Sequence, residues 1–188
     1  MDNLIIHSYN GSQSVQKAKF KRLFNEAFIR SERMNVALMS LLSLKKGIVF
    51  NLVTDEKDNV VGFYYIYSRD NMLFLYYLAV DKEYRGCGYG NKILLHLENT
   101  YASNPQSEFY VIAESIREGK DVSDIKIRRS KFYKRFGFEL TDYIVYDNSG
   151  AYDLYKKSSV KGTDIKQIKK IIKKLNPIEI CKIKSEEK

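Results

Sequence analysis

Three glycines at alternate positions, Gly86, Gly88 and Gly90, form the clearest chemical signal in the sequence. The apolar run Met72–Val80 precedes them, and a helical pattern that reaches about Tyr101 follows them. Glycine lets successive backbone N–H groups converge without a Cβ clash, and a helix N-terminus adds free N–H groups and the positive end of its dipole. This segment therefore predicts a site for an anion such as a pyrophosphate.

Two familiar anion-binding loops do not fit this segment. A Walker loop requires Gly-Lys-Ser or Gly-Lys-Thr, which the segment lacks. A dinucleotide-binding loop has its third glycine two residues further along and belongs to an early strand–helix–strand unit. Here the glycines lie in mid-chain, after strands that we expect to be antiparallel.

The elements that must position this loop follow from the order of apolar patterns. We expect strands at Leu4–Ile6, Ile48–Val53, Val60–Tyr67, Met72–Val80, Phe109–Ala113, Phe138–Tyr146 and Ala151–Tyr155, and helices at Val15–Phe28, Met34–Lys45, Gly90–Tyr101 and Asp124–Phe136. This order predicts a mixed α/β fold with a central, predominantly antiparallel sheet of six to seven strands, flanked by about four helices. Because Met72–Val80 is apolar or aromatic throughout, we expect it to be a central strand that is buried on both faces.

Charge is distributed unevenly along the chain of 188 residues, whose net charge is +9. Residues 156–188 carry 11 lysines and 4 acidic residues, so the rest of the chain is close to neutral. We therefore expect one folded domain, residues 1–157, followed by a lysine-rich helix and tail, residues 158–188. The near-neutral domain gives no reason to expect a nucleic-acid partner.

Other features of the sequence restrict the class of protein. No apolar run is long enough for a transmembrane segment, and the N-terminus does not resemble a secretion signal. Two cysteines, Cys87 and Cys181, and two histidines, His7 and His96, are too scattered for a disulfide framework or a metal site. We expect a cytoplasmic protein, and the abundance of Lys, Ile, Asn and Tyr favours a bacterial source.

Two segments resemble motifs of the GCN5-related N-acetyltransferases, the GNAT superfamily. Within Leu78–Asn91, the residues Arg85, Gly88 and Gly90 match motif A, Arg/Gln-x-x-Gly-x-Gly/Ala. Downstream, Lys131–Phe138 resembles the Phe/Leu-Tyr-x-x-x-Gly-Phe signature of the family. One helix and one strand separate the two motifs, which is the order that a GNAT-like fold requires.

The resemblance, which covers about residues 1–156, implies an enzyme that uses acetyl-CoA as its acetyl donor. It implies that acetyl-CoA lies where the strands Met72–Val80 and Phe109–Ala113 splay apart, with its pyrophosphate on the amides of Arg85–Asn91. A backbone N–H near Val80 would polarise the acetyl carbonyl. The residues that this assigns to acetyl-CoA binding are Leu78, Ala79, Val80, Arg85, Gly86, Cys87, Gly88, Tyr89, Gly90 and Asn91.

The resemblance also implies direct transfer to an amine acceptor, without an acyl-enzyme. A lysine-type amine has a pKa of about 10.4 and must lose a proton before it attacks, so a base is needed. Glu114 is the candidate base, since relatives use a glutamate on this strand; the alternative is a solvated carboxylate, and strand register decides between them. Glu26 and Glu32 are secondary candidates. Tyr133 matches the tyrosine that protonates the departing thiolate in relatives; the alternative is a core aromatic.

Further side chains could complete the site. Arg128 and Arg129 either bind the 3′-phosphate of acetyl-CoA or form a solvated helix face. Tyrosines either line an acceptor pocket or pack in the sheet, and the set comprises Tyr64, Tyr65, Tyr67, Tyr143, Tyr146 and Tyr152.

The tail has a helical stripe of Ile165, Ile168, Ile172 and Leu175 that ends before Pro177. This stripe predicts a C-terminal amphipathic helix, which Thr163 or Asp164 could cap, followed by a frayed end. The helix docks on its own domain or on a second copy in a homodimer, contacts RNA or an acidic partner, or lies on an anionic membrane surface.

Hypotheses of different classes therefore stand side by side. The first is an N-acetyltransferase that acts on a small-molecule, peptide or protein amine. The second is a catalytically silent acyl-CoA-binding regulatory module with the same fold. A third is an RNA-directed acetyltransferase that uses the basic tail.

Overall fold

The computed structural model describes residues 4–9, 14–118 and 123–185. The N-terminal half comprises β1 (Ile5–Ser8), α1 (Ser14–Ala27), α2 (Val36–Leu42), β2 (Ile48–Thr54), β3 (Val60–Arg69), β4 (Met72–Val80) and the short 3-10 helix η1 (Lys82–Tyr84). The C-terminal half comprises α3 (Tyr89–Tyr101), β5 (Glu108–Glu114), α4 (Asp124–Arg135), β6 (Glu139–Tyr146), β7 (Ala151–Lys157), α5 (Ile165–Leu175) and β8 (Lys182–Ser185).

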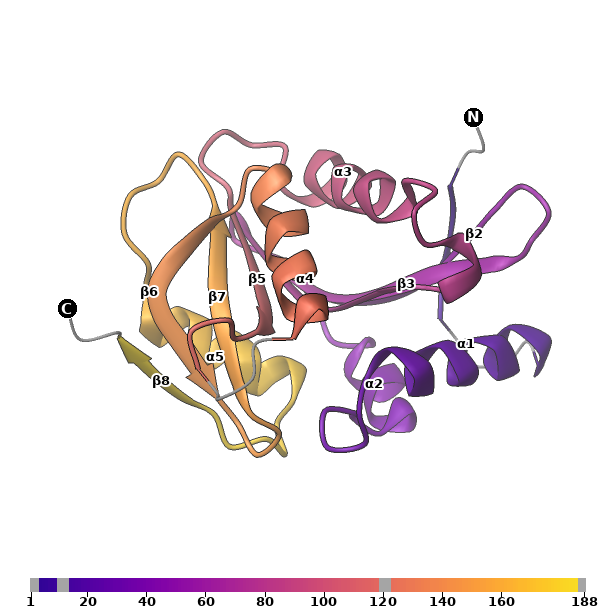
Figure 1. Ribbon diagram of the computed structural model, residues 1–188, viewed down its shortest axis with the longest axis horizontal. Helices are drawn as coiled ribbons and strands as arrows, with labels where there is room; N and C mark the ends of the chain where they lie inside the picture. Colours follow the sequence, from indigo (N-terminus) through magenta and orange to yellow (C-terminus); the bar gives the residue numbers. More distant parts are fainter. Residues whose placement is uncertain (1–3, 10–13, 119–122, 186–188) are drawn as a thin grey trace.

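The strands form one sheet in the order β1-β2-β3-β4-β5-β7-β6-β8 (Figure 1). All neighbouring pairs are antiparallel except β4 and β5, which are parallel. This confirms the mixed α/β fold with a predominantly antiparallel sheet. The described sheet has eight strands rather than six to seven, because β8 adds to the edge of β6.

The parallel pair β4 and β5 separates part of the way along its length. Residues Met72–Leu75 pair with Glu108–Val111, and β4 then continues to Val80 without pairing to β5. On its other side β4 stays paired with β3 as far as Val80, and β5 stays paired with β7 as far as Glu114. The gap therefore opens inside a sheet whose two halves are each firmly hydrogen-bonded.

Helices cover both faces of the sheet, and the sheet separates the core into two apolar clusters (Figure 1). One apolar cluster joins α1, α2 and α5 to one face, with Phe20, Met39 and Ile168 fully buried. The other cluster joins α3 and α4 to the opposite face, with Ile93 and Leu97 fully buried. As expected from its composition, β4 contributes side chains to both clusters.

A β-bulge in β4 places two consecutive tyrosines on the same face. Tyr65 of β3 lies opposite Tyr77, but the next residue of β3, Ile66, lies opposite Leu75, so Tyr76 is the extra residue. Both Tyr76 and Tyr77 pack with the α1–α2–α5 cluster, whereas strict alternation would put them on opposite faces.

The amphipathic helix α5 docks on its own chain. Its apolar residues Ile168, Ile171, Ile172 and Leu175 are buried under the sheet, and its lysines lie on the outer side. Asp164 caps the helix by accepting a hydrogen bond from the Gln167 N–H (3.0 Å). This confirms the interpretation in which the helix docks on its own domain.

The last residues of the chain, for which we expect fraying, lie outside the described residues, but the segment just before them, Lys182–Ser185, pairs with β6. The edge of β6 supplies backbone hydrogen-bond partners for this segment, and no side-chain pattern in the tail predicts such a strand. Within the described residues, no helix is long and apolar enough to cross a membrane.

Candidate active site

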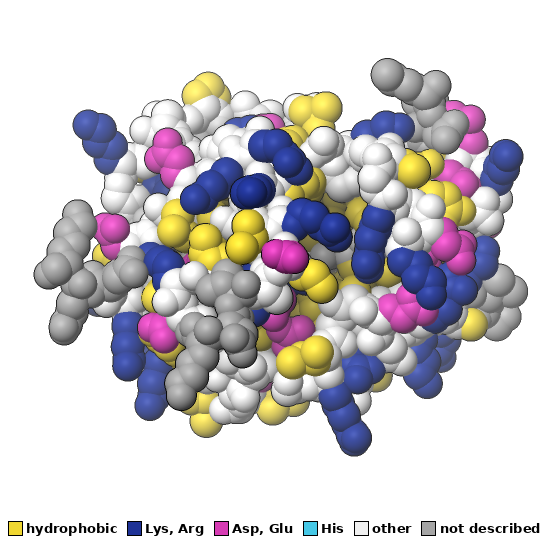
Figure 2. Space-filling model, viewed as in Figure 1, with side chains coloured by type: hydrophobic (Ala, Val, Ile, Leu, Met, Phe, Trp, Pro, Cys, Tyr) yellow, Lys and Arg dark blue, Asp and Glu magenta, His cyan; other side chains and the backbone are white. Residues whose placement is uncertain are grey.

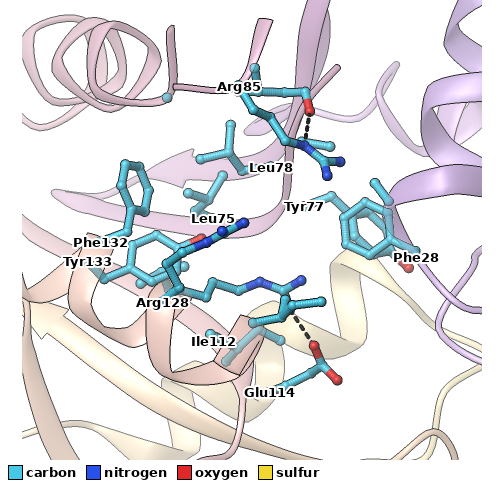
Figure 3. Close-up of a pocket in the computed structure, with 18 of the residues that line it drawn as sticks. Phe28, Leu75, Tyr77, Leu78, Arg85, Ile112, Glu114, Arg128, Phe132 and Tyr133 are labelled. Atoms are coloured by element: carbon cyan, nitrogen blue, oxygen red, sulfur yellow. Dashed lines mark hydrogen bonds and ion pairs between the residues drawn. The ribbon is translucent and has the colours of Figure 1, made fainter. Parts of the chain in front are cut away.

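A cavity of about 860 Å³ opens where β4 and β5 separate. Its walls come from the loop before α3, from α4, from the connection between α1 and α2, and from the turn between β6 and β7. In Figure 2, Lys and Arg side chains gather around a hollow whose floor is apolar. Figure 3 shows Leu75 and Leu78 of β4 at the base of the cavity, facing Phe132 and Tyr133 of α4.

The glycine loop forms one end of the cavity. Gly86 and Gly88 have φ angles of +82° and +83°, and Gly88 is the N-cap residue of α3. A Cβ atom at either position would meet nothing within 4 Å, so the glycines are needed for backbone conformation and not for space inside the protein. Gly90 is different, because a Cβ there would lie 3.2 Å from the Phe132 ring.

Four arginines line the cavity and bring positive charge to its walls. Arg85 belongs to the loop and its Nε donates a hydrogen bond to the Val80 carbonyl oxygen (3.1 Å), which ties the loop to the end of β4. Arg128, Arg129 and Arg135 line the cavity from α4. Arg129 pairs with Glu114, whereas Arg85, Arg128 and Arg135, together with the α3 N-terminus, suit a phosphate-bearing ligand.

The structure brings together most of the residues that the sequence assigns to donor binding. Only Cys87 is outside the cavity lining, and its side chain is exposed. The members of the set that line the cavity are Leu78, Ala79, Val80, Arg85, Gly86, Gly88, Tyr89, Gly90 and Asn91.

Glu114 faces the cavity at the end of β5, where Arg129 holds its carboxylate. The Arg129 Nη1 atom lies 2.5 Å from Glu114 Oε2, and both side chains are about one-third exposed (Figure 3). Strand register thus places Glu114 towards the cavity, as its candidate role requires, and the ion pair restrains it there.

A buried network fixes the end of β5 beside Glu114. The Asp153 carboxylate, fully buried on β7, accepts hydrogen bonds from the Ser115 hydroxyl (2.8 Å), the Ile116 N–H (2.9 Å) and the Arg117 Nε (2.8 Å). Charge-assisted bonds of this kind in a buried setting restrain the backbone strongly. Asp153, which lies on the neighbouring strand β7, therefore helps to fix the position of Glu114.

Glu32 lines the cavity from the connection between α1 and α2. Its Oε1 accepts a hydrogen bond from the Tyr152 hydroxyl (2.9 Å) and its Oε2 accepts one from the Ile29 N–H (3.3 Å). Burial raises the pKa of Glu32, and the nearby negative charge of Glu114 adds to this rise. A carboxylate with a raised pKa is a stronger base than an ordinary glutamate, which suits it to accept a proton.

Carboxylates and aromatic rings dominate the end of the cavity that lies away from the glycine loop. Asp147 comes from the β6–β7 turn, which its carboxylate caps by accepting from the Ser149 and Gly150 N–H groups (2.8 and 3.0 Å). The rings of Phe28 and Tyr77 meet edge to face, with centroids 4.8 Å apart (Figure 3). This end can receive a cationic group, by charge and by the aromatic faces.

Tyr133 is buried in the cavity wall on α4, next to Phe132 and Tyr155. Burial raises the pKa of Tyr133 to about 12, so its hydroxyl keeps its proton at neutral pH. The residue is thus both part of the α3–α4 core cluster and part of the cavity lining.

The sequence is a poor guide to this end of the cavity. Of the six tyrosines considered for an acceptor pocket, only Tyr152 is among the lining residues, while Tyr64 and Tyr65 are fully buried in the two core clusters. Phe28, Tyr76, Tyr77 and Asp147 line the cavity without carrying any motif. The apolar run of β4 could have indicated Tyr76 and Tyr77, but only the bulge turns both to the cavity side.

A family model described as an acetyltransferase (GNAT) domain matches residues 46–140 of the chain. This segment contains the glycine loop, Glu114 and Tyr133, whereas Glu32, Asp147, Tyr152 and α5 lie outside it. A comparison with curated protein sequences gives no significant match.

Solved structures share the fold at low sequence identity. A protein from Bacteroides thetaiotaomicron assigned to the GNAT family superposes with a TM-score of 0.69 at 20% identity, covering 90% of this chain and 96% of that one. An aminoglycoside 6′-N-acetyltransferase in complex with coenzyme A superposes with a TM-score of 0.62 at 15% identity, covering 85% and 99%. Naa50 from Arabidopsis thaliana, bound to the bisubstrate analogue CoA-Ac-MVNAL, gives 0.58 at 20% identity, covering 82% and 98%.

Proposed function

This chain belongs to the GNAT family of acetyltransferases, and from that premise we propose that it transfers the acetyl group of acetyl-CoA directly to an amine. The observation that carries the proposal is one cavity with two unlike ends. The glycine loop and arginines suit the phosphates of the donor. The carboxylates and tyrosines suit a protonated amine.

Acetyl-CoA supplies the activated acetyl group when it is bound. On the protein side, the amides of Gly86–Asn91 and the α3 N-terminus would hold its pyrophosphate, and Arg85 and Arg128 would add positive charge. The edge of β4 that does not pair with β5 offers backbone groups to the pantetheine amides. A backbone N–H near Val80 would donate a hydrogen bond to the acetyl carbonyl oxygen as negative charge develops on it.

Two carboxylates could accept the proton that the amine loses, and their surroundings favour Glu32. Arg129 occupies Oε2 of Glu114, so an amine would compete with a guanidinium for that atom. Glu32 has a raised pKa and receives its side-chain hydrogen bond from a neutral tyrosine. We therefore assign proton acceptance to Glu32 and give Glu114 the task of holding Arg129 and adding negative charge near the amine.

Tyr133 is assigned to protonate the thiolate that leaves. Its hydroxyl is protonated at neutral pH because burial raises its pKa to about 12, and the residue lines the cavity from α4. A hydrogen-bond donor beside a developing thiolate stabilises it, and proton transfer completes the departure of CoA.

The experiment combines a binding measurement with a transfer measurement. Acetyl-CoA is titrated by calorimetry, and thiol release is then followed with spermidine, kanamycin and a peptide with a free N-terminal amine. We expect acetyl-CoA to bind and thiol to appear only when one class of amine is present. Binding without release on any amine would favour a silent acyl-CoA-binding module, and the absence of binding would contradict the proposal at its first step.

A further inference from the structure

The C-terminal segment that begins with α5 reaches the back of the acceptor end. It lies outside the part of the chain that matches the family model, and it packs on the sheet face opposite α3 and α4. The Tyr65 hydroxyl donates a hydrogen bond to the Leu175 carbonyl oxygen (3.1 Å), which fixes the last turn of α5 against β3. The residue that follows, Asn176, is buried although it is polar.

Asn176 is connected to Glu32 through two tyrosines of the cavity wall. Its Nδ2 donates a hydrogen bond to the Tyr76 hydroxyl (3.2 Å), and Tyr76 is the residue that the β4 bulge adds. The Tyr76 ring packs edge to face on Tyr77, with centroids 4.8 Å apart. The Tyr77 hydroxyl in turn donates to the Glu32 carbonyl oxygen and accepts from the Met34 N–H (3.3 Å).

A second connection runs from Glu179 to the Glu32 side chain. Glu179 Oε1 accepts a hydrogen bond from the Asn148 N–H (3.0 Å) in the β6–β7 turn. In the same turn, Ser149 Oγ lies 2.6 Å from the Tyr152 hydroxyl oxygen. Tyr152 then donates to Glu32 Oε1 (2.9 Å).

The two connections meet at the same residue from different sides. Asn176 acts on the backbone of Glu32 through Tyr76 and Tyr77, and Glu179 acts on its carboxylate through the turn and Tyr152. We propose that Asn176 and Glu179 are positioning residues of the acceptor site. They place Glu32 and the acceptor-side walls without touching either substrate, and this inference rests on the proposed function.

The donor end should be independent of this segment. The glycine loop joins α3, and the arginines come from α4, both on the opposite face of the sheet. A change at Asn176 or Glu179 should therefore alter the Michaelis constant for the amine and leave acetyl-CoA affinity unchanged. A general loss of folding would alter both.

The test compares Asn176→Ala and Glu179→Ala with Ile178→Ala, an exposed residue of the same segment. The amine is whichever of spermidine, kanamycin and the peptide gives the highest kcat/KM with the wild-type protein. We expect the KM for the amine to rise about fivefold in each of the first two variants, the effect of one lost hydrogen bond. We expect Ile178→Ala to match wild type and calorimetry to give one acetyl-CoA affinity for all four proteins.

Tyr76→Phe removes the hydroxyl that accepts the Asn176 hydrogen bond. This variant keeps the test usable if Asn176→Ala does not fold. Combining Tyr76→Phe with Asn176→Ala should raise KM no further than either change alone. Wild-type values of the amine KM in Asn176→Ala, Tyr76→Phe and Glu179→Ala would overturn the inference, as would a parallel loss of acetyl-CoA affinity. Wild-type protein that transfers to none of the amines would overturn the proposed function, and this inference with it.

Discussion

Residues of the same type have different roles in the cavity because their neighbours differ. Glu114 is held by Arg129, and Glu26 lies 3.5 Å from Lys82, whereas the side chain of Glu32 is held by a hydroxyl and a backbone N–H. Burial raises the pKa of Glu32, and this effect exceeds the lowering caused by the Tyr152 hydrogen bond and by the positive charge of Arg129. A base works best when its pKa is near the working pH, so Glu32 has the most suitable setting of the three.

The first residue-scale prediction concerns activity. Glu32→Gln should lower kcat/KM for the amine about 100-fold at neutral pH, the usual contribution of a general base. In the wild type, activity should rise with pH through the raised pKa of Glu32, and the variant should lose this limb of the profile. Glu26→Gln is the matched control and should stay close to wild type. A larger loss in Glu114→Gln than in Glu32→Gln would return the role of base to Glu114.

The second residue-scale prediction concerns stability. Because the pKa of Glu32 is raised in the folded state, the folded protein binds more protons than the unfolded chain between the two pKa values. The resulting cost is absent below the unfolded pKa of about 4.3 and fully present above the folded pKa. Urea unfolding should therefore shift in favour of Glu32→Gln on going from about pH 4 to pH 7. A stability difference that does not change with pH would show that the carboxyl carries no such cost.

The third residue-scale prediction separates catalysis from packing at Tyr133. Tyr133→Phe should lower kcat about tenfold or more and leave acetyl-CoA affinity unchanged, since the ring remains and only the proton donor is lost. Tyr155→Phe is the matched control, because it removes a hydroxyl from the neighbouring buried ring. Equal kcat values for Tyr133→Phe and wild type would leave Tyr133 as a core aromatic.

Among the elements, β4 and the loop after it follow closely from local sequence. A run that is apolar at every position indicates burial on both faces, and alternate glycines before a helix indicate an anion site. The bulge at Tyr76 depends on pairing with β3 and on the contact with Asn176, which is 100 residues further along. No local pattern encodes contacts of that range, so the acceptor wall could not be predicted.

The C-terminal elements show the same limit. The stripe of Ile168, Ile172 and Leu175 predicts α5 because it repeats at helical spacing. The following strand, Lys182–Ser185, has no alternating pattern of large buried residues. It forms because β6 offers an open edge. Its existence depends on where the helix delivers the chain, which only the folded structure determines.

The element-scale prediction concerns the glycine loop. Gly88→Ala should weaken acetyl-CoA binding about tenfold, because an L-residue at a φ of +83° costs about 1–2 kcal/mol and the loop would relax away from its anion-binding form. Gly162→Ala is the matched control, with a φ of +78° and equally open surroundings in the tail. Both variants should lose similar stability, and only Gly88→Ala should lose affinity in calorimetry. Equal affinities would show that the loop does not bind the donor.

Under the proposed function, the sheet divides the whole molecule into a donor side and an acceptor side. The cluster with α3 and α4 supports the loop and the arginines, and the cluster with α1, α2 and α5 supports the acceptor end. Because β4 contributes to both clusters, it connects the two sides across the cavity. The apolar face of α5, in the basic tail, is thus part of the core.

At this scale we predict that α5 contributes to global stability. Ile172→Ala should lower the free energy of unfolding by about 2–5 kcal/mol, the usual cost of removing a buried isoleucine side chain. Ile178→Ala, at a residue that is 74% exposed, should change it by less than about 0.5 kcal/mol. Urea denaturation followed by tyrosine fluorescence measures both. A small effect of Ile172→Ala would mean that α5 is only loosely attached.

The most direct test of the central claim follows the acetyl group itself. Acetyl-CoA labelled in its acetyl group is incubated with the protein and each of spermidine, kanamycin and the free peptide, and the products are identified by mass spectrometry. The account predicts label bound to a nitrogen of one acceptor class, and much less label with Glu32→Gln. Label that stays on CoA with every amine, or appears only as free acetate, would contradict it.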